Sequence, residues 1–332
     1  MALTLPLTRL GFGAAPIAGL FTPVDDDTAA ATVDAAWAAG IRYFDTAPHY
    51  GLGVSERRLG AALARRDRDS YVLSTKAGRL LVPDGASGHS DTEGFAVPAT
   101  HRRVWDLSRD GIRRSLDDSL TRLGLDRVDV LYLHDPEGRL DEAVATALPA
   151  LAELRREGAV TAIGAGSKDA AALARLVRAA DLDVVMVAGR YTLLEQPALT
   201  ELFPACSAAG VAVVAAGVFN SGLLAAAVPG PGSTYEYGAV PPDMLRHATE
   251  LAAVCAAHDT PLPRAALHFA LRHPLVRSAV VGMRSPAEVA QNAAWLNTPV
   301  APELWAALEG RGLIPAGGAS AAPAPSTPSP TP

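Results

Sequence analysis

The sequence has only two cysteines, Cys206 and Cys255, in 332 residues. A small secreted domain held by disulfides needs more of them, and neither thiol has a set of His or Cys partners at the spacing of a metal site. We therefore expect a reducing, cytoplasmic environment, in which both thiols are buried among apolar side chains.

Basic clusters and long apolar runs are missing as well. The formal net charge is -6 and the Lys and Arg residues are scattered, which argues against binding to nucleic acid or to an anionic membrane. No run approaches the roughly 18 apolar residues that span a bilayer, and residues 1–13 lack the pattern of a targeting signal. These absences favour a soluble protein with a small-molecule partner, and they leave its oligomeric state open.

What the sequence does contain is an alternation of short β-rich runs with longer Ala- and Leu-rich amphipathic runs. The strands are predicted at 9–12, 41–44, 71–74, 128–133, 160–163, 184–187, 211–215 and 278–281. The helices are predicted near 27–39, 53–64, 108–122, 142–156, 168–180, 197–208, 242–257 and 286–295. Eight such pairs predict an α/β fold of the (β/α)8 TIM-barrel type.

Local signals at the ends of these elements agree with a barrel. Ser285 and Glu288 form a capping-box pattern around Pro286, which predicts the start of the last barrel helix. Extra helices are predicted over 263–272 and 302–310. Helix ends are predicted at four glycines, Gly40, Gly124, Gly158 and Gly210.

Two long connections and a biased tail complete the organisation. Segments 78–107 and 217–241 follow predicted strands and are long enough to be lids or binding loops, or else poorly ordered segments. Residues 315–332 are rich in Pro, Ala, Ser and Thr without periodicity, so we expect a barrel domain over 1–314 followed by a disordered tail.

Candidate catalytic residues stand where three successive predicted strands end. Asp45 ends the second strand, Lys76 follows the third, His134 follows the fourth, and Tyr50 lies on the loop after Asp45. In a barrel of this type the carboxyl ends of the strands form the active site. An ammonium beside a phenol lowers the phenol pKa, so Lys76, held by Asp45, would make Tyr50 a proton donor and acceptor, with His134 bonded to the reacting oxygen. An alternative is a lyase in which Lys76 forms a Schiff base.

Three segments that carry these residues resemble the signatures of the aldo-keto reductase superfamily. They are the stretch 45–60 (DTAPHYGLGVSERRLG), Ser74-Thr75-Lys76 and Leu131-Tyr132-Leu133-His134. The resemblance covers about residues 7 to 312. It implies a barrel that binds an extended nicotinamide cofactor, NAD or NADP, without a metal. It also implies that Tyr50 is the general acid/base, that Lys76 and Asp45 tune it, and that His134 orients the substrate.

Further segments are similar to one branch of that superfamily, which holds D-threo-aldose 1-dehydrogenase, L-fucose dehydrogenase and pyridoxal 4-dehydrogenase. They are residues 108–116, 134–136, 188–194 and 218–222. This similarity implies oxidation of a sugar lactol, or of a related cyclic hemiacetal, with Trp105 and His49 in the substrate pocket. A general NADPH-dependent aldehyde or ketone reductase and a cofactor-binding regulatory subunit, like the potassium channel beta subunits, are the alternatives within the family.

The nicotinamide end of the expected cofactor site departs from the family pattern. The stretch 164–168 lacks the usual Ser-Asn pair, Ala188 stands near the usual Gln, and Ala216 stands near the usual aromatic residue. We therefore expect Ser167 and backbone groups to bind the carboxamide, and Phe219 or Tyr191 to contact the ring.

The adenosine end resembles the family more closely, over residues 281–292. A carboxylate, Glu288, stands where an Arg often meets the 2′-phosphate of NADP, which favours NAD. The remaining expected cofactor contacts are Ser221, Gly222, Leu223, Gly282, Arg284, Gln291 and Asn292.

Overall fold

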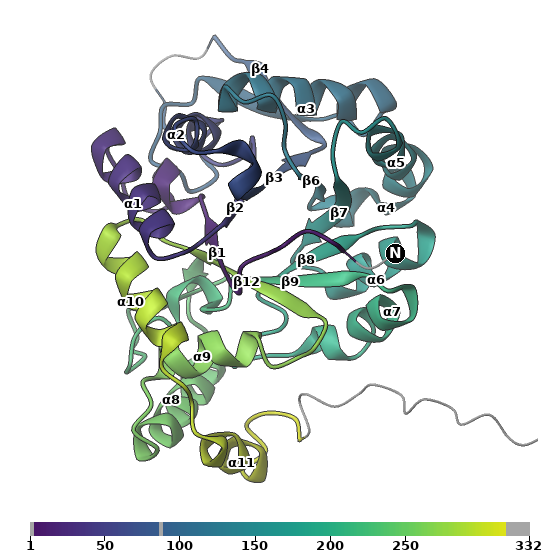
Figure 1. Cartoon of the computed structure of the whole chain (residues 1–332). Coiled ribbons are helices and arrows are strands. Elements are labelled where there is room, and N and C mark those ends of the chain that lie inside the picture. The colour runs from purple at the N-terminus through teal and green to yellow at the C-terminus, as the bar shows by residue number, and fades with distance from the viewer. Residues whose placement is uncertain (1–2, 86–88, 317–332) are drawn as a thin grey trace, which may run out of the picture.

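Eight parallel strands form a closed barrel in the computed structural model, which describes residues 3–85 and 89–316 (Figure 1). The order of the strands around the barrel is β1-β12-β9-β8-β7-β6-β3-β2. Their bounds are Leu10–Gly13 (β1), Tyr43–Asp45 (β2), Val72–Ala77 (β3), Val130–His134 (β6), Ala162–Ser167 (β7), Val184–Ala188 (β8), Ala212–Ala216 (β9) and Val276–Gly282 (β12). Each corresponds to one of the strands predicted from the sequence, so the (β/α)8 fold is confirmed.

Helices surround the barrel and cover its outer face (Figure 1). The first six are α1 (Asp26–Ala38), α2 (Val54–Leu63), α3 (Arg109–Leu123), α4 (Leu140–Glu142), α5 (Leu148–Arg156) and α6 (Ala170–Ala179). The others are α7 (Leu202–Ala209), α8 (Pro242–Ala257), α9 (Leu262–Ala270), α10 (Pro286–Asn297) and α11 (Pro302–Gly310). A π-helical turn at Ala143–Ala147 joins α4 to α5, and the predicted helix 197–208 is divided into a 3-10 turn at Pro197–Leu199 and α7. The two extra helices expected near the C-terminus are α9 and α11.

The predicted helix boundaries agree with the backbone. All four glycines expected to end helices have a positive φ, between 63° and 84°, which a residue with a Cβ adopts only at a cost. At the start of α10, the Glu288 N–H donates to Ser285 Oγ over 3.3 Å. The Glu288 carboxylate accepts from the backbone N–H of Arg284 rather than from that of Ser285, so the reciprocal bond lies one residue earlier than in a standard capping box.

The barrel interior is filled and is closed at its N-terminal end. Its buried side chains include two tyrosines, Tyr43 and Tyr132, packed among Val, Ala and Met residues of the strands. Leu3, Leu5 and Leu7 pack against this cluster from the segment that precedes β1, which crosses the barrel opening in Figure 1. Access to the strand residues is therefore from the opposite, C-terminal end.

The long connections at that open end contain secondary structure that the sequence patterns did not predict. The loop after β3 carries the antiparallel pair β4 (Arg79–Pro83) and β5 (His101–Trp105). The loop after β9 carries a shorter pair, β10 (Thr234–Tyr235) and β11 (Gly238–Ala239). Both pairs lie outside the barrel sheet, so they are available to line the site.

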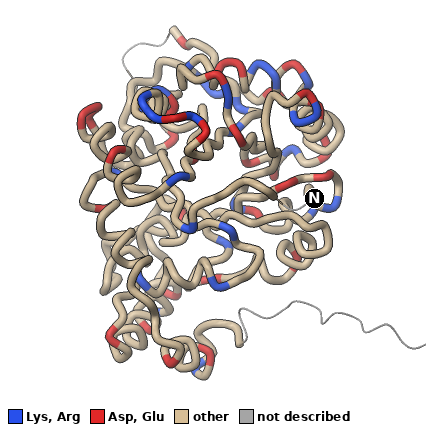
Figure 2. Tube along the Cα trace, viewed as in Figure 1, with Lys and Arg blue, Asp and Glu red and all other residues tan. Residues whose placement is uncertain are grey.

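Charged residues of both signs alternate on the outer helices (Figure 2). Between α3 and α5, for example, Arg109 pairs with Glu153 and Arg113 pairs with Glu157. In the part of the chain that the structure describes, no helix has the length and apolar character needed to cross a membrane. Residues 317–332, most of the predicted tail, lie outside the described residues.

Candidate active site

The side chains of Asp45 and Lys76 meet at the ends of the adjacent strands β2 and β3. Lys76 Nζ lies 2.7 Å from Asp45 Oδ2 and also donates to the backbone oxygen of Thr46 over 2.9 Å. Both charged side chains are almost fully buried, at 2% and 3% exposure. Because a buried charge is unfavourable without a partner, each of these side chains stabilises the other.

Tyr50 and His134 complete this group of residues. The Lys76 ammonium lies 4.7 Å from the centre of the Tyr50 ring, and the His134 ring centre lies 5.9 Å from that of Tyr50. The Phe95 ring stacks on that of Tyr50, with ring centres 6.1 Å apart. The structure therefore brings together the four residues that the sequence proposed as catalytic.

The electrostatics of Tyr50 differ from the simple expectation. Burial raises the pKa of Tyr50 to about 12, although the neighbouring Lys76 acts to lower it. Burial also acts to lower the pKa of Lys76, but Asp45 and Tyr50 outweigh that effect and raise it. The ammonium does lower the phenol pKa as expected, but burial raises it by more. In the free protein, then, Tyr50 is a protonated phenol beside a firmly charged amine.

Two neutral histidines lie beside Tyr50. Burial, with the nearby charges of Arg79 and Lys76, holds the pKa of His134 well below its ordinary value. Burial and Arg103 lower the pKa of His49 to about 3. The two imidazole centres are 5.5 Å apart, which places His49 at the site as the sequence predicted. A neutral imidazole donates a hydrogen bond without carrying a charge, which suits His134 for orienting a substrate oxygen.

Below Asp45, a chain of hydroxyl groups runs into the barrel interior. Ser74 Oγ donates to Asp45 Oδ1 over 2.7 Å, and the Tyr43 hydroxyl lies 3.2 Å from Ser74 Oγ and 3.1 Å from the Tyr132 hydroxyl. Strand periodicity contains a signal for these residues, because each lies two positions before Asp45, Lys76 or His134 and so faces the same side. Ser74 holds the Asp45 carboxylate directly, and Asp45 in turn holds Lys76.

The aldo/keto reductase family model matches residues 9–311, a span that holds all four catalytic candidates. The chain belongs to the aldo/keto reductase family. It is accordingly an NAD(P)-dependent oxidoreductase.

Known relatives cover nearly the whole chain of this aldo/keto reductase. The D-threo-aldose 1-dehydrogenase of a Pseudomonas species is 53% identical over 94% of this chain and 96% of its own. The pyridoxal 4-dehydrogenase of Microbacterium luteolum is 38% identical over 93% and 95%. Among solved structures, an aldo-keto reductase of Bacillus halodurans in its holo form superposes with a TM-score of 0.72 at 27% identity, covering 93% of both chains.

The adenosine end of the expected cofactor site offers suitable groups. Asn292 is 5% exposed and donates through Nδ2 to the Glu288 backbone oxygen, while its Oδ1 is buried with no hydrogen-bond partner among the described residues. Arg284 donates to Thr22 Oγ1 over 2.7 Å and lies 3.4 Å from the Glu288 carboxylate. Gln291 is exposed on the same helix. An unpaired buried acceptor fits the amino group of adenine, so this segment fits the cofactor.

At the nicotinamide end, Ser167 lies at the end of β7. Ser167 Oγ donates to Glu137 over 2.8 Å and accepts from the Asp169 N–H over 2.9 Å, so carboxamide binding would have to replace or share these bonds. Phe219 packs edge-on against Trp295 of α10 at 6.3 Å. Both residues remain candidates for the cofactor site.

Tyr191 does not fit its expected contact with the nicotinamide ring. It is 1% exposed and packs against Phe203 at 4.7 Å and Phe269 at 5.2 Å, among α7 and α9. With both faces covered by apolar neighbours, this ring belongs to the outer core of the barrel.

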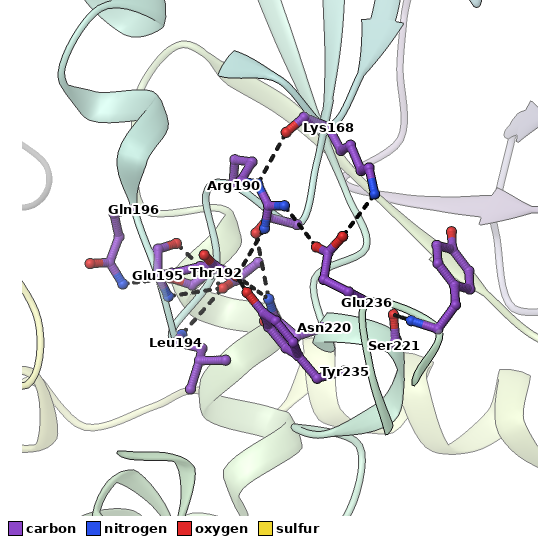
Figure 3. A network of polar contacts seen from close by, with 12 residues as sticks. Lys168, Arg190, Thr192, Leu194, Glu195, Gln196, Asn220, Ser221, Tyr235 and Glu236 are labelled. Carbon is purple, nitrogen blue, oxygen red and sulfur yellow. Dashed lines mark hydrogen bonds and ion pairs between the residues drawn. The ribbon is translucent and has the colours of Figure 1, made fainter. Parts of the chain in front are cut away.

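The loop 217–241 is fastened to the ends of β7 and β8 by a polar network that the sequence did not predict (Figure 3). Glu236 pairs with Arg190 at 2.8 Å and with Lys168 at 2.9 Å. Glu195 accepts from the Tyr235 hydroxyl at 2.8 Å and from Asn220 Nδ2 at 3.0 Å. These contacts hold the loop beside the mouth of the barrel.

The remaining expected cofactor residues, three in that loop and Gly282 on β12, differ in the groups that they expose to solvent. Ser221 Oγ accepts from the Tyr237 N–H over 3.3 Å, and Gly222 is exposed. The Leu223 side chain is fully buried, and its N–H donates to the Asn220 oxygen over 3.2 Å. Gly282, at the end of β12, is exposed, and a Cβ there would lie 2.8 Å from Pro16. Ser221, Gly222 and Gly282 thus present polar or backbone groups, whereas Leu223 contributes packing.

Trp105 flanks the site from β5. The Arg79 guanidinium lies 4.6 Å from the centre of its ring, and the same guanidinium pairs with Asp135, the residue after His134, at 2.7 Å. Two side chains, Arg79 and Asp135, thus connect Trp105 to His134, so Trp105 remains a candidate for the substrate pocket.

Proposed function

We propose that this aldo-keto reductase oxidises an aldose, in its cyclic hemiacetal form, to the lactone. The observation that carries the proposal is the buried Lys76–Asp45 pair beside Tyr50 and a neutral His134, in a chain 53% identical to a D-threo-aldose 1-dehydrogenase. A hemiacetal carbon carries both the hydrogen that leaves as hydride and the hydroxyl that must lose its proton. The residues present supply what that hydroxyl needs.

In the oxidative direction, Tyr50 accepts the proton of the anomeric hydroxyl. His134 donates a hydrogen bond to the same oxygen and so fixes its position. A bound NAD or NADP would supply the acceptor for the hydride that leaves the anomeric carbon. Lys76 stabilises the negative charge that develops on Tyr50, and Asp45 keeps Lys76 in place. In the reductive direction Tyr50 gives the proton back.

We propose NAD as the preferred cofactor. The support is Glu288, whose carboxylate lies 3.4 Å from Arg284 and offsets the positive charge that would otherwise attract a 2′-phosphate. A carboxylate suits a free ribose hydroxyl. Initial rates with NAD and NADP at equal concentration test this preference, and a large advantage for NADP would contradict it.

A second candidate substrate is pyridoxal, because a pyridoxal 4-dehydrogenase is 38% identical to this chain. Pyridoxal also forms an internal hemiacetal, so the same residues would serve. The Schiff-base lyase is disfavoured, because such a nucleophile must be a neutral, accessible amine, whereas Lys76 is buried and charged. A purely regulatory role makes no use of the complete catalytic group.

A reducing, cytoplasmic location is part of the proposal. Its support is that both cysteines are free and buried, and that burial raises the pKa of Cys206 and of Cys255 to about 12. Neither thiol is suited to reaction or disulfide exchange.

A substrate screen tests the proposed function. The purified protein is assayed with NAD against a panel of aldoses and pyridoxal, and with NADH and NADPH against simple aldehydes. We expect the highest kcat/KM for an aldose with NAD. If only simple aldehydes react, and with NADPH, the protein is a general reductase instead.

A further inference from the structure

Asp135 has an unusual backbone for a residue with a side chain. Its φ is 42° and its ψ is 56°, in the left-handed region, and it precedes Pro136, which normally favours an extended conformation. The Asp135 N–H donates to the Gly166 oxygen of β7 over 2.8 Å, which holds the strained turn in place. Strain of this kind persists where the surroundings enforce it, and it is frequent at ligand-binding positions.

The turn directs the Asp135 carboxylate toward the catalytic histidine. Asp135 Oδ2 accepts from Arg79 over 2.7 Å and lies 3.5 Å from His134 Nε2. The latter distance is too long for a good hydrogen bond, so His134 Nε2 is not committed to Asp135. Among the described residues, Asp135 Oδ1 accepts no hydrogen bond, and the side chain is 32% exposed. The carboxylate is therefore held by Arg79 through one oxygen, and the side chain is partly exposed.

Other residues at the mouth leave this carboxylate accessible to a ligand while restricting its motion. Arg79 is itself stacked on Trp105, so it cannot easily move with Asp135. Tyr237 is 65% exposed, and its ring contacts that of Phe21, with ring centres 5.7 Å apart.

We propose that Asp135 binds the hydroxyl on the carbon next to the reacting one, and so selects 2-hydroxy aldoses over substrates that lack this group. This inference rests on the proposed aldose oxidation. The reacting oxygen would be bonded to His134, and Asp135 Oδ2 lies 3.5 Å from His134 Nε2. The Asp135 carboxylate is therefore placed beside the carbon next to the reacting one.

The energy of this hydrogen bond is large enough for Asp135 to discriminate between substrates with and without the 2-hydroxyl. A hydroxyl that donates to a carboxylate makes a charge-assisted hydrogen bond, stronger than one between neutral groups. A substrate without that hydroxyl would leave the second oxygen of the carboxylate partly desolvated and without a hydrogen bond, while the first stays paired with Arg79. A site built to accept a substrate hydroxyl rejects analogues that lack it more strongly than an apolar pocket rejects a missing methylene.

The test compares an aldose with its 2-deoxy analogue in wild type and Asp135→Asn. Asparagine has nearly the same shape and tolerates left-handed backbone, so the fold should be kept. We expect kcat/KM for the aldose to fall roughly 10- to 100-fold, while that for the 2-deoxy analogue changes less than about threefold. The preference for the 2-hydroxy substrate should collapse. Asp141→Asn, at an exposed carboxylate paired with Arg175, is the matched control and should leave both values unchanged.

Other results would overturn the inference. An equal fall for both substrates assigns Asp135 only a structural role through Arg79 or His134. Aldose oxidation by the wild type without preference for the 2-hydroxyl contradicts the inference alone, whereas a wild type that oxidises no aldose contradicts the proposed function as well. Should Asp135→Asn fail to fold, Asp135→Gly accepts the same backbone, lacks the carboxylate and is expected to lose the same preference.

Discussion

Lys76 Nζ lies 4.7 Å from the centre of the Tyr50 ring. At this distance its charge lowers the pKa of Tyr50, but by less than burial of the phenol raises it. Because burial outweighs the charge of Lys76, the tyrosine is protonated in the free protein. The same balance also determines how the reaction should depend on pH.

Aldose oxidation should accelerate with pH, because Tyr50 must lose its proton to act as a base and its pKa lies near 12. Carbonyl reduction should slow over the same range, because it needs the protonated phenol. While Tyr50 limits the rate, each pH unit changes it by at most about tenfold. The check is kcat/KM in both directions across neutral to alkaline pH. A pH-independent oxidation rate would show that another group accepts the proton.

His49 should make the protein less stable in acid. Its pKa is lowered to about 3 in the folded protein, from about 6.5 in an unfolded chain, so the unfolded state binds the extra proton first. The contribution of neutral His49 to the free energy of unfolding is fully present above pH 6.5 and is lost as the pH falls toward 3. His49→Gln, which cannot titrate, should lose less stability over this interval, as measured by the denaturant midpoint at several pH values. Identical pH dependence in both proteins would contradict the account.

Ser74→Ala should impair catalysis through Asp45, because Ser74 bonds to that carboxylate rather than to the substrate. The change removes the hydrogen bond to Asp45 and leaves the Tyr43 hydroxyl with only Tyr132, which should cost about 1–3 kcal/mol in the free energy of unfolding. We expect kcat to fall with KM nearly unchanged, and Ser74→Thr to restore much of the loss. Tyr132→Phe, at the far end of the chain of hydroxyls, is the control for stability alone. Equal kcat in Ser74→Ala and wild type would remove Ser74 from the positioning of Asp45.

Glu236→Gln should loosen the loop 217–241. The change weakens the contacts with both Arg190 and Lys168 in Figure 3, whereas the Glu195 contacts remain. Hydrogen exchange of the backbone in this loop should become faster, while exchange in the barrel strands stays the same. Glu250→Gln, at an exposed position on α8, is the matched control. Unchanged exchange in the loop would mean that Glu195 and packing alone hold it.

The barrel, and the grouping of its four candidate catalytic residues, were predictable because both depend on local patterns. Short β-rich runs between amphipathic runs located the strands, and Asp45, Lys76 and His134 stand at strand ends, where the fold itself fixes their direction. The β4–β5 pair was missed because its strands carry charged and apolar residues without a clear core-facing alternation, and their pairing is between distant segments.

Side-chain environments were less accessible from sequence. The sequence around Tyr191 does not indicate that this residue is buried. Its burial results from contacts with Phe203 and Phe269, on two helices that follow later in the chain. The pKa of Tyr50 depends on a balance between burial and Lys76, and a sequence shows the charges but not the depth.

The central claim is that Tyr50 carries the proton, and Tyr50→Phe tests it most directly, since it removes one oxygen and keeps the ring that packs on Phe95. The measurement is kcat for aldose oxidation together with the Kd of the cofactor. We predict that kcat falls by roughly 100- to 10,000-fold while the Kd is unchanged. Turnover equal to that of the wild type, with the variant folded and cofactor bound, would contradict the mechanism.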